Sequence, residues 1–276
     1  MLKIKNLLLI IALAVSGLNA YALHIKAEEA FSKGVELYND DQMPQAMQCF
    51  KLWLKSNPGD AYSWAYVAAI EMEAKHYYAA LDASDNSLKG TWVNDRDTTF
   101  KSWNYYNRSI IHANIGDTVA AIEDISRAID LNHSDPDYYY RRATLYNKQK
   151  EYYLAAADFE QAIRMSEADA EPYIALGCVY SAQGRRDDAI EAFTRAIEVE
   201  PRNSNAYSYR AAEHFNNKNM GAAVSDDIQA LQLDRNSVHA LWVLEYLKAD
   251  AKGTLEPALR QKARETGDNT WLDLLK

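Results

Sequence analysis

Small and apolar residues recur along most of the chain with the spacing of amphipathic helices, and this pattern repeats every 34 residues. In the segment 170–203, apolar side chains at 189–197 follow the i, i+3, i+4, i+7 spacing that places them on one helical face. Gly184 favours a left-handed turn that ends the preceding helix near Gln183, and Pro201 stops the following helix. Each 34-residue segment is therefore predicted to be a helical hairpin.

The 34-residue frame divides the chain into six repeats, with a seven-residue insertion at 95–101. The repeats are 27–60, 61–94, 102–135, 136–169, 170–203 and 204–237. Their twentieth residue is always alanine, namely Ala46, Ala80, Ala121, Ala155, Ala189 and Ala223. Small residues at a fixed phase let two helices approach closely, while aromatic residues fill the gaps between them. We expect the insertion to form either a loop or an extension of a neighbouring helix.

The residues that recur are those of a known repeat. The fifth repeat carries Tyr173, Leu176-Gly177, Tyr180, Ala189, Phe193, Ala196 and Pro201. This pattern resembles the tetratricopeptide repeat (TPR) of exported bacterial proteins, over residues 27–237 and most clearly over 136–203. The resemblance implies an all-α fold, a right-handed α-α superhelix of about six hairpins. Four positions depart from the pattern: Ser84, Ser87, Trp92 and Asp227.

The last 39 residues, 238–276, are predicted to be capping helices. A stack of repeats leaves an apolar face at its end, and that face needs a cover with a polar outer side. A first helix at 238–249, a second that begins at Thr254 and ends at Gly267, and a closing apolar turn fit this role.

Composition narrows the functions. The chain has 30 basic and 39 acidic residues, a formal charge of −9, so it lacks the basic excess with which proteins neutralise nucleic-acid phosphates. The six histidines have no metal-ligand spacing, and no phosphate loop, nucleophile elbow or CxxC motif is present. We therefore expect no enzyme activity, no cofactor, no metal site and no nucleic-acid partner.

Several histidine, arginine and cysteine residues are predicted to have structural rather than functional roles. His112 and His214 occupy places that hold tyrosine in other repeats, so they are predicted to be aromatic core substitutes. Ion pairs or exposed turns are favoured over an anion site for the arginine pairs at 141–142 and 185–186. Cys49 and Cys178 fall in the first and fifth repeats, too far apart along a stack to form a disulfide, so two free thiols are expected.

The N-terminal segment 1–22 has the features of a secretory signal. Two lysines precede an apolar run at 7–15, and small and polar residues lead to Ala22, after which cleavage is expected. The run is too short to span a bilayer comfortably, and no later segment suggests membrane insertion, although an uncleaved anchor stays open. A periplasmic or secreted protein is therefore expected.

One face of each first helix is predicted to bind a partner, because the second, fifth, ninth and twelfth places share one side and line the concave groove in proteins of the resembled family. The predicted partner-binding residues are Phe31, Tyr38, Tyr62, Met72, Trp103, Tyr106, Tyr140, Ile174 and Phe215. Family members that clamp a peptide carboxylate use Lys and Asn at two of these places. Phe31 and Val35 stand there instead, so that mechanism is not expected here.

Two functions follow from these features. The first is a non-enzymatic scaffold of the bacterial envelope that binds a peptide or protein segment on its apolar, aromatic groove. The second is a structural or self-associating solenoid in which the aromatic residues only pack against adjacent helices or another copy. A contiguous exposed apolar patch would favour the first function, and scattered buried rings the second. The sequence indicates neither the partner nor the oligomeric state.

Overall fold

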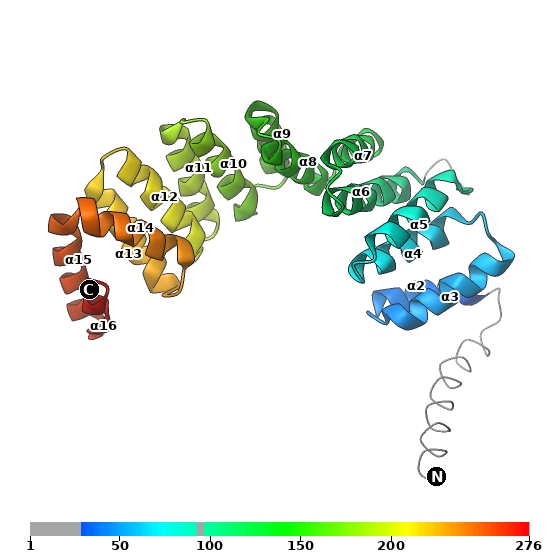
Figure 1. Ribbon diagram of the computed structural model, residues 1–276, viewed down its shortest axis with the longest axis horizontal. Coiled ribbons are helices and arrows are strands. Elements are labelled where there is room, and N and C mark those ends of the chain that lie inside the picture. Colours follow the sequence, from blue (N-terminus) through cyan, green and yellow to red (C-terminus); the bar gives the residue numbers. More distant parts are fainter. Residues whose placement is uncertain (1–28, 93–96, 276) are drawn as a thin grey trace, which may run out of the picture. The chain divides into compact units, whose positions relative to one another are not determined.

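The computed structural model describes residues 29–92 and 97–275, and within these ranges the regular structure is helical apart from one isolated bridge between Asp60 and Thr91 (Figure 1). The all-α prediction is confirmed. The predicted signal segment 1–22 lies outside the described residues. None of the described helices has both the length and the apolar content of a membrane span.

The chain divides into two compact units, which meet in sequence between His133 and Ser134. The N-terminal unit contains three hairpins. Its helices are α2 (Ala30–Asn39), α3 (Met43–Ser56), α4 (Ala61–Glu73), α5 (Tyr77–Lys89), α6 (Thr98–Asn114) and α7 (Thr118–Leu131). Part of the 95–101 insertion is helical, because α6 already begins at Thr98.

The C-terminal unit contains three hairpins followed by three further helices. The hairpins are α8 (Pro136–Lys148) with α9 (Tyr152–Met165), α10 (Ala170–Ala182) with α11 (Arg186–Val199), and α12 (Ser204–Asn216) with α13 (Met220–Leu233). The last helices are α14 (Val238–Asp250), α15 (Lys252–Thr266) and α16 (Thr270–Asp273). Leu244, Leu247, Leu255 and Leu259 of α14 and α15 join Leu231 of α13 in one buried apolar cluster.

Close helix contact holds each hairpin together. The alanine at the twentieth place has 0% exposure in all six repeats. A β-carbon added to Gly34 would lie 2.8 Å from the ring of Phe50, and one added to Gly177 would lie 2.5 Å from Phe193. Both distances are shorter than packed carbon atoms tolerate. Glycine is therefore required at positions 34 and 177, because an aromatic ring lies directly against the backbone there.

Each hairpin turns through one residue with a positive φ, at the fifteenth place of its repeat. These residues are Asp41, Lys75, Gly116, Lys150, Gly184 and Lys218. The prediction that Gly184 is left-handed is confirmed, since its φ is +75°. The sequence does not reveal the turns at Asp41, Lys75, Lys150 and Lys218 as readily, because lysine or aspartate accepts this conformation only at some energetic cost.

Polar side chains fix where several first helices begin. The side chains of Asp60, Asp135, Asp169, Asn203 and Ser237 each accept a hydrogen bond from a backbone N–H in the first turn of the following helix. Such caps satisfy N–H groups that have no partner within the helix, and each contributes about 1 kcal/mol. The loop before these helices is therefore specified locally by the sequence.

An arginine–aspartate ion pair recurs between the two helices of three hairpins. The pairs are Arg108–Asp124, Arg142–Asp158 and Arg210–Asp226, with nitrogen–oxygen distances of 2.6, 2.7 and 2.8 Å. Each guanidinium donates two hydrogen bonds to its carboxylate, the geometry in which charged hydrogen bonds are strongest. The ion-pair prediction is confirmed for Arg142.

The predicted aromatic substitutes His112 and His214 also have a polar role. Their Nε2 atoms lie 3.5 and 3.8 Å from the carboxylates of Asp124 and Asp226, beside the arginines. The imidazoles are half-buried, and burial lowers the pKa of His214. They therefore pack as aromatic rings next to an ion pair.

In the second repeat, the serines that replace the usual phenylalanine and alanine form hydrogen bonds between helices. Ser84 Oγ donates to Asn104 Oδ1 at 2.6 Å, and Ser87 Oγ donates to the carbonyl of Ala61 at 2.7 Å. All three polar side chains are fully buried. Buried polar groups are tolerated when they are paired in this way.

Both cysteines are free thiols, as the sequence predicts.

Asp227 is a buried acid at the place where other repeats carry phenylalanine. Its exposure is 0%, and neither carboxylate oxygen has a hydrogen-bond partner among the described residues. Burial, followed by the nearby charge of Asp226, raises the pKa of Asp227 to about 8. The folded protein therefore keeps this carboxyl protonated at neutral pH, whereas the unfolded chain releases the proton near pH 4.

Asp227→Asn should stabilise the protein, because it removes a group that must take up a proton on folding. As the pH rises from about 4 to about 8, the wild type should lose stability relative to the variant, by about 4 kcal/mol at pH 7. Urea unfolding followed by circular dichroism at several pH values measures this difference. The exposed Asp250→Asn is the control, and a pH-independent gap between Asp227→Asn and wild type would contradict the interpretation.

Candidate functional site

The predicted binding residues of the N-terminal unit lie in a network of aromatic rings that pack on one another. Phe31 contacts Tyr62 at 6.5 Å between ring centroids, Tyr62 contacts Phe100 at 5.2 Å, and Phe100 contacts Trp103 at 5.3 Å. Tyr66 also contacts Phe31, Phe100 and Trp103. These rings are half-buried, so they contribute to packing between repeats.

The remaining predicted binding residues of the N-terminal unit expose little of their side chains to solvent. The ring of Tyr38 lies 5.1 Å from that of Tyr66, and the hydroxyl of Tyr62 donates to Asp97. Met72 and Tyr106 are half-buried. Some large apolar side chains of the described residues are exposed to solvent, but none of the predicted binding residues of the N-terminal unit is among them.

The predicted residues of the C-terminal unit differ in their surroundings. Tyr140 makes an edge-to-face contact with Phe159 at 5.4 Å, and Ile174 is buried with 7% exposure. Phe215 instead lines a pocket with residues from three successive first helices. The structure therefore brings Phe215 together with groups that were outside the predicted binding set.

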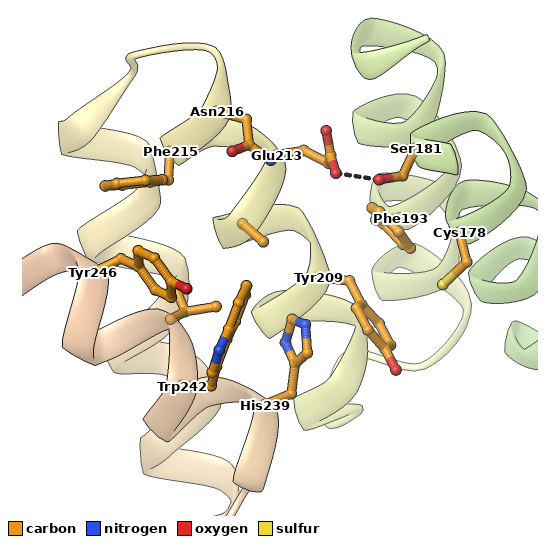
Figure 2. A pocket seen from close by; sticks show the side chains of 12 residues that line it. Cys178, Ser181, Phe193, Tyr209, Glu213, Phe215, Asn216, His239, Trp242 and Tyr246 are labelled. Carbon is orange, nitrogen blue, oxygen red and sulfur yellow. Dashed lines mark hydrogen bonds between the residues drawn. The ribbon is translucent and has the colours of Figure 1, made fainter. Parts of the chain in front are cut away.

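This pocket lies between α10, α12 and α14, with Phe193 of α11 also in its lining, and has a volume of about 380 Å³ (Figure 2). It is lined by Cys178, Ser181, Phe193, Tyr209, Ala212, Glu213, Phe215, Asn216, His239, Trp242, Val243 and Tyr246. Figure 2 shows the rings of Tyr209, His239, Trp242 and Tyr246 on one side of the space and Glu213 on the other. We call it the C-terminal pocket.

Aromatic rings form a continuous row along the pocket. The centroid distances are 4.3 Å for Tyr209–His239, 5.7 Å for His239–Trp242, 4.6 Å for Trp242–Tyr246 and 6.0 Å for Tyr246–Phe215. Trp242 and Tyr246 nevertheless remain 53% and 46% exposed. Contiguous aromatic surface that stays exposed is typical of interaction sites.

Glu213 gives the pocket a negative group. It is only 5% exposed, and its Oε1 accepts a hydrogen bond from Ser181 Oγ at 2.5 Å. Burial raises the pKa of Cys178 to about 11, and the charges of Glu213 and Glu171 add to this shift. Burial also lowers the pKa of His239, so this imidazole is neutral at neutral pH. The pocket therefore combines an apolar wall with a carboxylate.

A second hollow of about 510 Å³ adjoins the C-terminal pocket at Trp242 and His239, which line both. Its other lining residues are Asn205, Asp234, Asn236, Ser237 and Val238. Trp242 thus stands between two hollows, a geometry that suits a ligand longer than one side chain. We call the two hollows together the C-terminal groove.

Most of this groove lies on the helix face that sequence periodicity predicts to bind a partner. Ser181, Phe215, His239, Trp242 and Tyr246 all follow the second, fifth, ninth and twelfth places of their repeats. The predicted set favoured the N-terminal unit because aromatic residues are densest there. Tyr209 and Glu213 stand one place off the pattern, so periodicity alone does not select them.

Comparison with known proteins supports this description of the repeats. Residues 136–169 and 174–238 match family models described as tetratricopeptide repeat. The chain contains tetratricopeptide repeats. Proteins with these repeats bind peptides or other proteins. A search of curated proteins finds no match.

Several solved structures resemble the tetratricopeptide-repeat chain. MamA is 24% identical with a TM-score of 0.56, over 63% of this chain and 92% of MamA. YrrB, described as a TPR protein with an unusual peptide-binding site, is 18% identical with a TM-score of 0.60, over 71% of this chain and 97% of YrrB. The C-terminal part of a TPR repeat-containing protein from Cytophaga hutchinsonii is 17% identical with a TM-score of 0.71, over 89% of this chain and 99% of that one. At these identities the likeness shows the fold.

Trp103→Ala and Trp242→Ala should separate packing from binding residues. Trp103 packs against Phe100 and Tyr66, so its truncation should lower the free energy of unfolding by roughly 2 to 4 kcal/mol. Trp242 is half-exposed, so its truncation should cost about 1 kcal/mol or less. Urea unfolding measures both, with the exposed Tyr153→Ala as control. Equal losses in the two tryptophan variants would show that Trp242 is a packing residue.

Proposed function

We propose that this protein is a non-enzymatic interaction scaffold of the bacterial envelope whose C-terminal groove binds a segment of another protein. The observation that carries the proposal is the row of aromatic rings along the pocket, in which Trp242 and Tyr246 stay exposed. Ligand sites are usually concave and mostly apolar, with a few polar groups that fix orientation. The C-terminal pocket has this composition.

The helical repeats explain why a segment of protein suits the groove. Successive first helices contribute α10, α12 and α14, so side chains recur along the groove at the interval of one repeat. An extended or helical segment can contact several of these helices at once. YrrB, which shares the fold, is described as having a peptide-binding site, and this supports the same class of ligand here.

Export is a further part of the proposal. It depends on the signal-like segment 1–22, with two lysines, a short apolar run and a small residue at Ala22. The partner would then be a protein of the cell envelope.

Self-association is the second candidate function. Tyr78 on α5 and Tyr153 on α9 are 78% and 82% exposed, and both stand at the eighteenth place of their repeats, outside the groove. Exposed aromatic side chains can pair with another copy of the chain. A contact between copies at either residue would serve a structural solenoid that has no peptide ligand.

Photo-crosslinking in cells distinguishes the two functions. A photoreactive phenylalanine analogue at position 242 should give adducts with another protein, whereas the same analogue at position 153 should not. Mass spectrometry of the adducts identifies the partner and maps the contact. Adducts that contain only a second copy of this chain, or adducts at 153 but none at 242, would contradict the groove and favour self-association.

A further inference from the structure

We propose that the C-terminal pocket selects a basic side chain, arginine in preference to lysine, from the bound protein segment. The cation would lie against the rings of Trp242 and Tyr246 and be attracted by the carboxylate of Glu213. This inference rests on the proposed function, because it specifies what the groove recognises.

The charge of the pocket favours a cation. Glu213 is the one acidic or basic residue among the side chains that line it, apart from the neutral His239. Ser181 donates a hydrogen bond to Glu213 but carries no charge. Arg186 lies outside the lining, with its Nε 4.0 Å from Glu213 Oε2 and its side chain 51% exposed. The negative charge of Glu213 is therefore only partly balanced within the protein.

The aromatic wall favours a guanidinium group. Elsewhere in the C-terminal unit, Arg235 stacks over Trp271 at 3.7 Å and Arg185 over Tyr180 at 4.2 Å. Among the described residues, Lys218 Nζ lies 5.7 Å from the ring centroid of Phe215 at one end of the row, but no basic side chain stacks on Trp242 or Tyr246, although both rings are about half-exposed. Arginine stacks on aromatic rings and is less strongly hydrated than lysine, so it loses less on entering such a site.

The rest of the groove has the same sign of charge. Asp234 lines the second hollow beside Trp242, whereas the adjacent Arg235 is paired with Asp268 and Thr270. A third hollow on the first helices of this unit is lined by Asp137, Asp169 and Glu171. An acidic surface attracts basic segments and orients them during encounter.

An apolar side chain would fit the pocket less well. It would exclude water from the side of Glu213 that faces the pocket without supplying a charge, and further desolvation of a carboxylate whose charge is only partly balanced is costly. A cation both covers the rings and pairs with the carboxylate. The combination of exposed rings with a buried acid therefore distinguishes a basic ligand from a hydrophobic one.

Selection from random peptides tests the preference even though the partner is unidentified. The full chain is immobilised and panned with a phage-displayed library of random peptides. We expect enriched sequences to share one basic residue, arginine more often than lysine, flanked by apolar residues. Enriched sequences without a basic residue would overturn this inference and leave the proposed function intact, whereas the absence of any enrichment would count against both.

A double-mutant cycle then tests the role of Glu213. With a synthetic enriched peptide, replacement of its basic residue by glutamine should weaken binding to the wild type at least tenfold, measured by calorimetry. The same replacement in the peptide should change binding to the Glu213→Gln variant by less than about threefold, because this variant lacks the negative charge that pairs with the basic residue. Equal losses in both proteins would show that Glu213 does not recognise the cation.

Two further variants keep the test informative. Glu245→Gln removes an exposed negative charge from α14 outside the pocket, so it should behave like the wild type in the cycle. Trp242→Ala should weaken the arginine peptide more than the glutamine peptide, because it removes the stacking surface. If Glu245→Gln reproduced the effect of Glu213→Gln, the preference would reflect overall charge and the proposed pocket would be wrong.

Discussion

The structure depends on one steric constraint, which is that the two helices of each hairpin pack closely around a small residue; in two hairpins an aromatic ring touches the opposite backbone. Gly34 lies against Phe50 and Gly177 against Phe193, with no room for a β-carbon. The buried alanines at the twentieth place maintain the same closeness in every repeat. Because this contact fixes how the two helices pack, the same face of each first helix is presented again one repeat later.

The C-terminal groove follows from this regularity and from the way in which the repeats end. Within a stack, the next first helix covers part of each exposed face. After α14, the chain continues into α15 and α16, and α15 packs against α13 and α14. No further hairpin follows α14 within the described residues, so Trp242 and Tyr246 keep much of their surface accessible. The helix that follows the last repeat, α14, thus exposes rings that an inner repeat would bury.

Sequence alone predicted the hairpins well, because their rules are local and recur at a fixed interval. The alanine at the twentieth place, the left-handed Gly184 and the helix end before Pro201 are all visible in the sequence. The ion pairs Arg108–Asp124 and Arg210–Asp226 were missed, although their common spacing of 16 residues was available as a signal. The tetratricopeptide-repeat models match the repeats in which these rules are clearest.

The candidate site was harder to predict, because periodicity identifies a face and does not reveal how much of it stays exposed. Phe31 and Trp103 occupy the same face of their helices as Trp242 does, yet their rings pack on Tyr66 and other aromatic neighbours. Glu213 stands one place off the groove pattern and enters the pocket only through the packing of α10 against α12. Exposure and burial of this kind depend on contacts between repeats, which a single sequence does not specify.

The central claim is that the C-terminal groove, rather than the N-terminal aromatic network, holds the partner. Hydrogen–deuterium exchange of the full chain with and without a bound peptide tests this most directly, because bound segments slow the exchange of the helices that they contact. The account predicts slower exchange in α12 and α14, with α2, α4 and α6 unchanged. Protection confined to α2, α4 and α6 would contradict it.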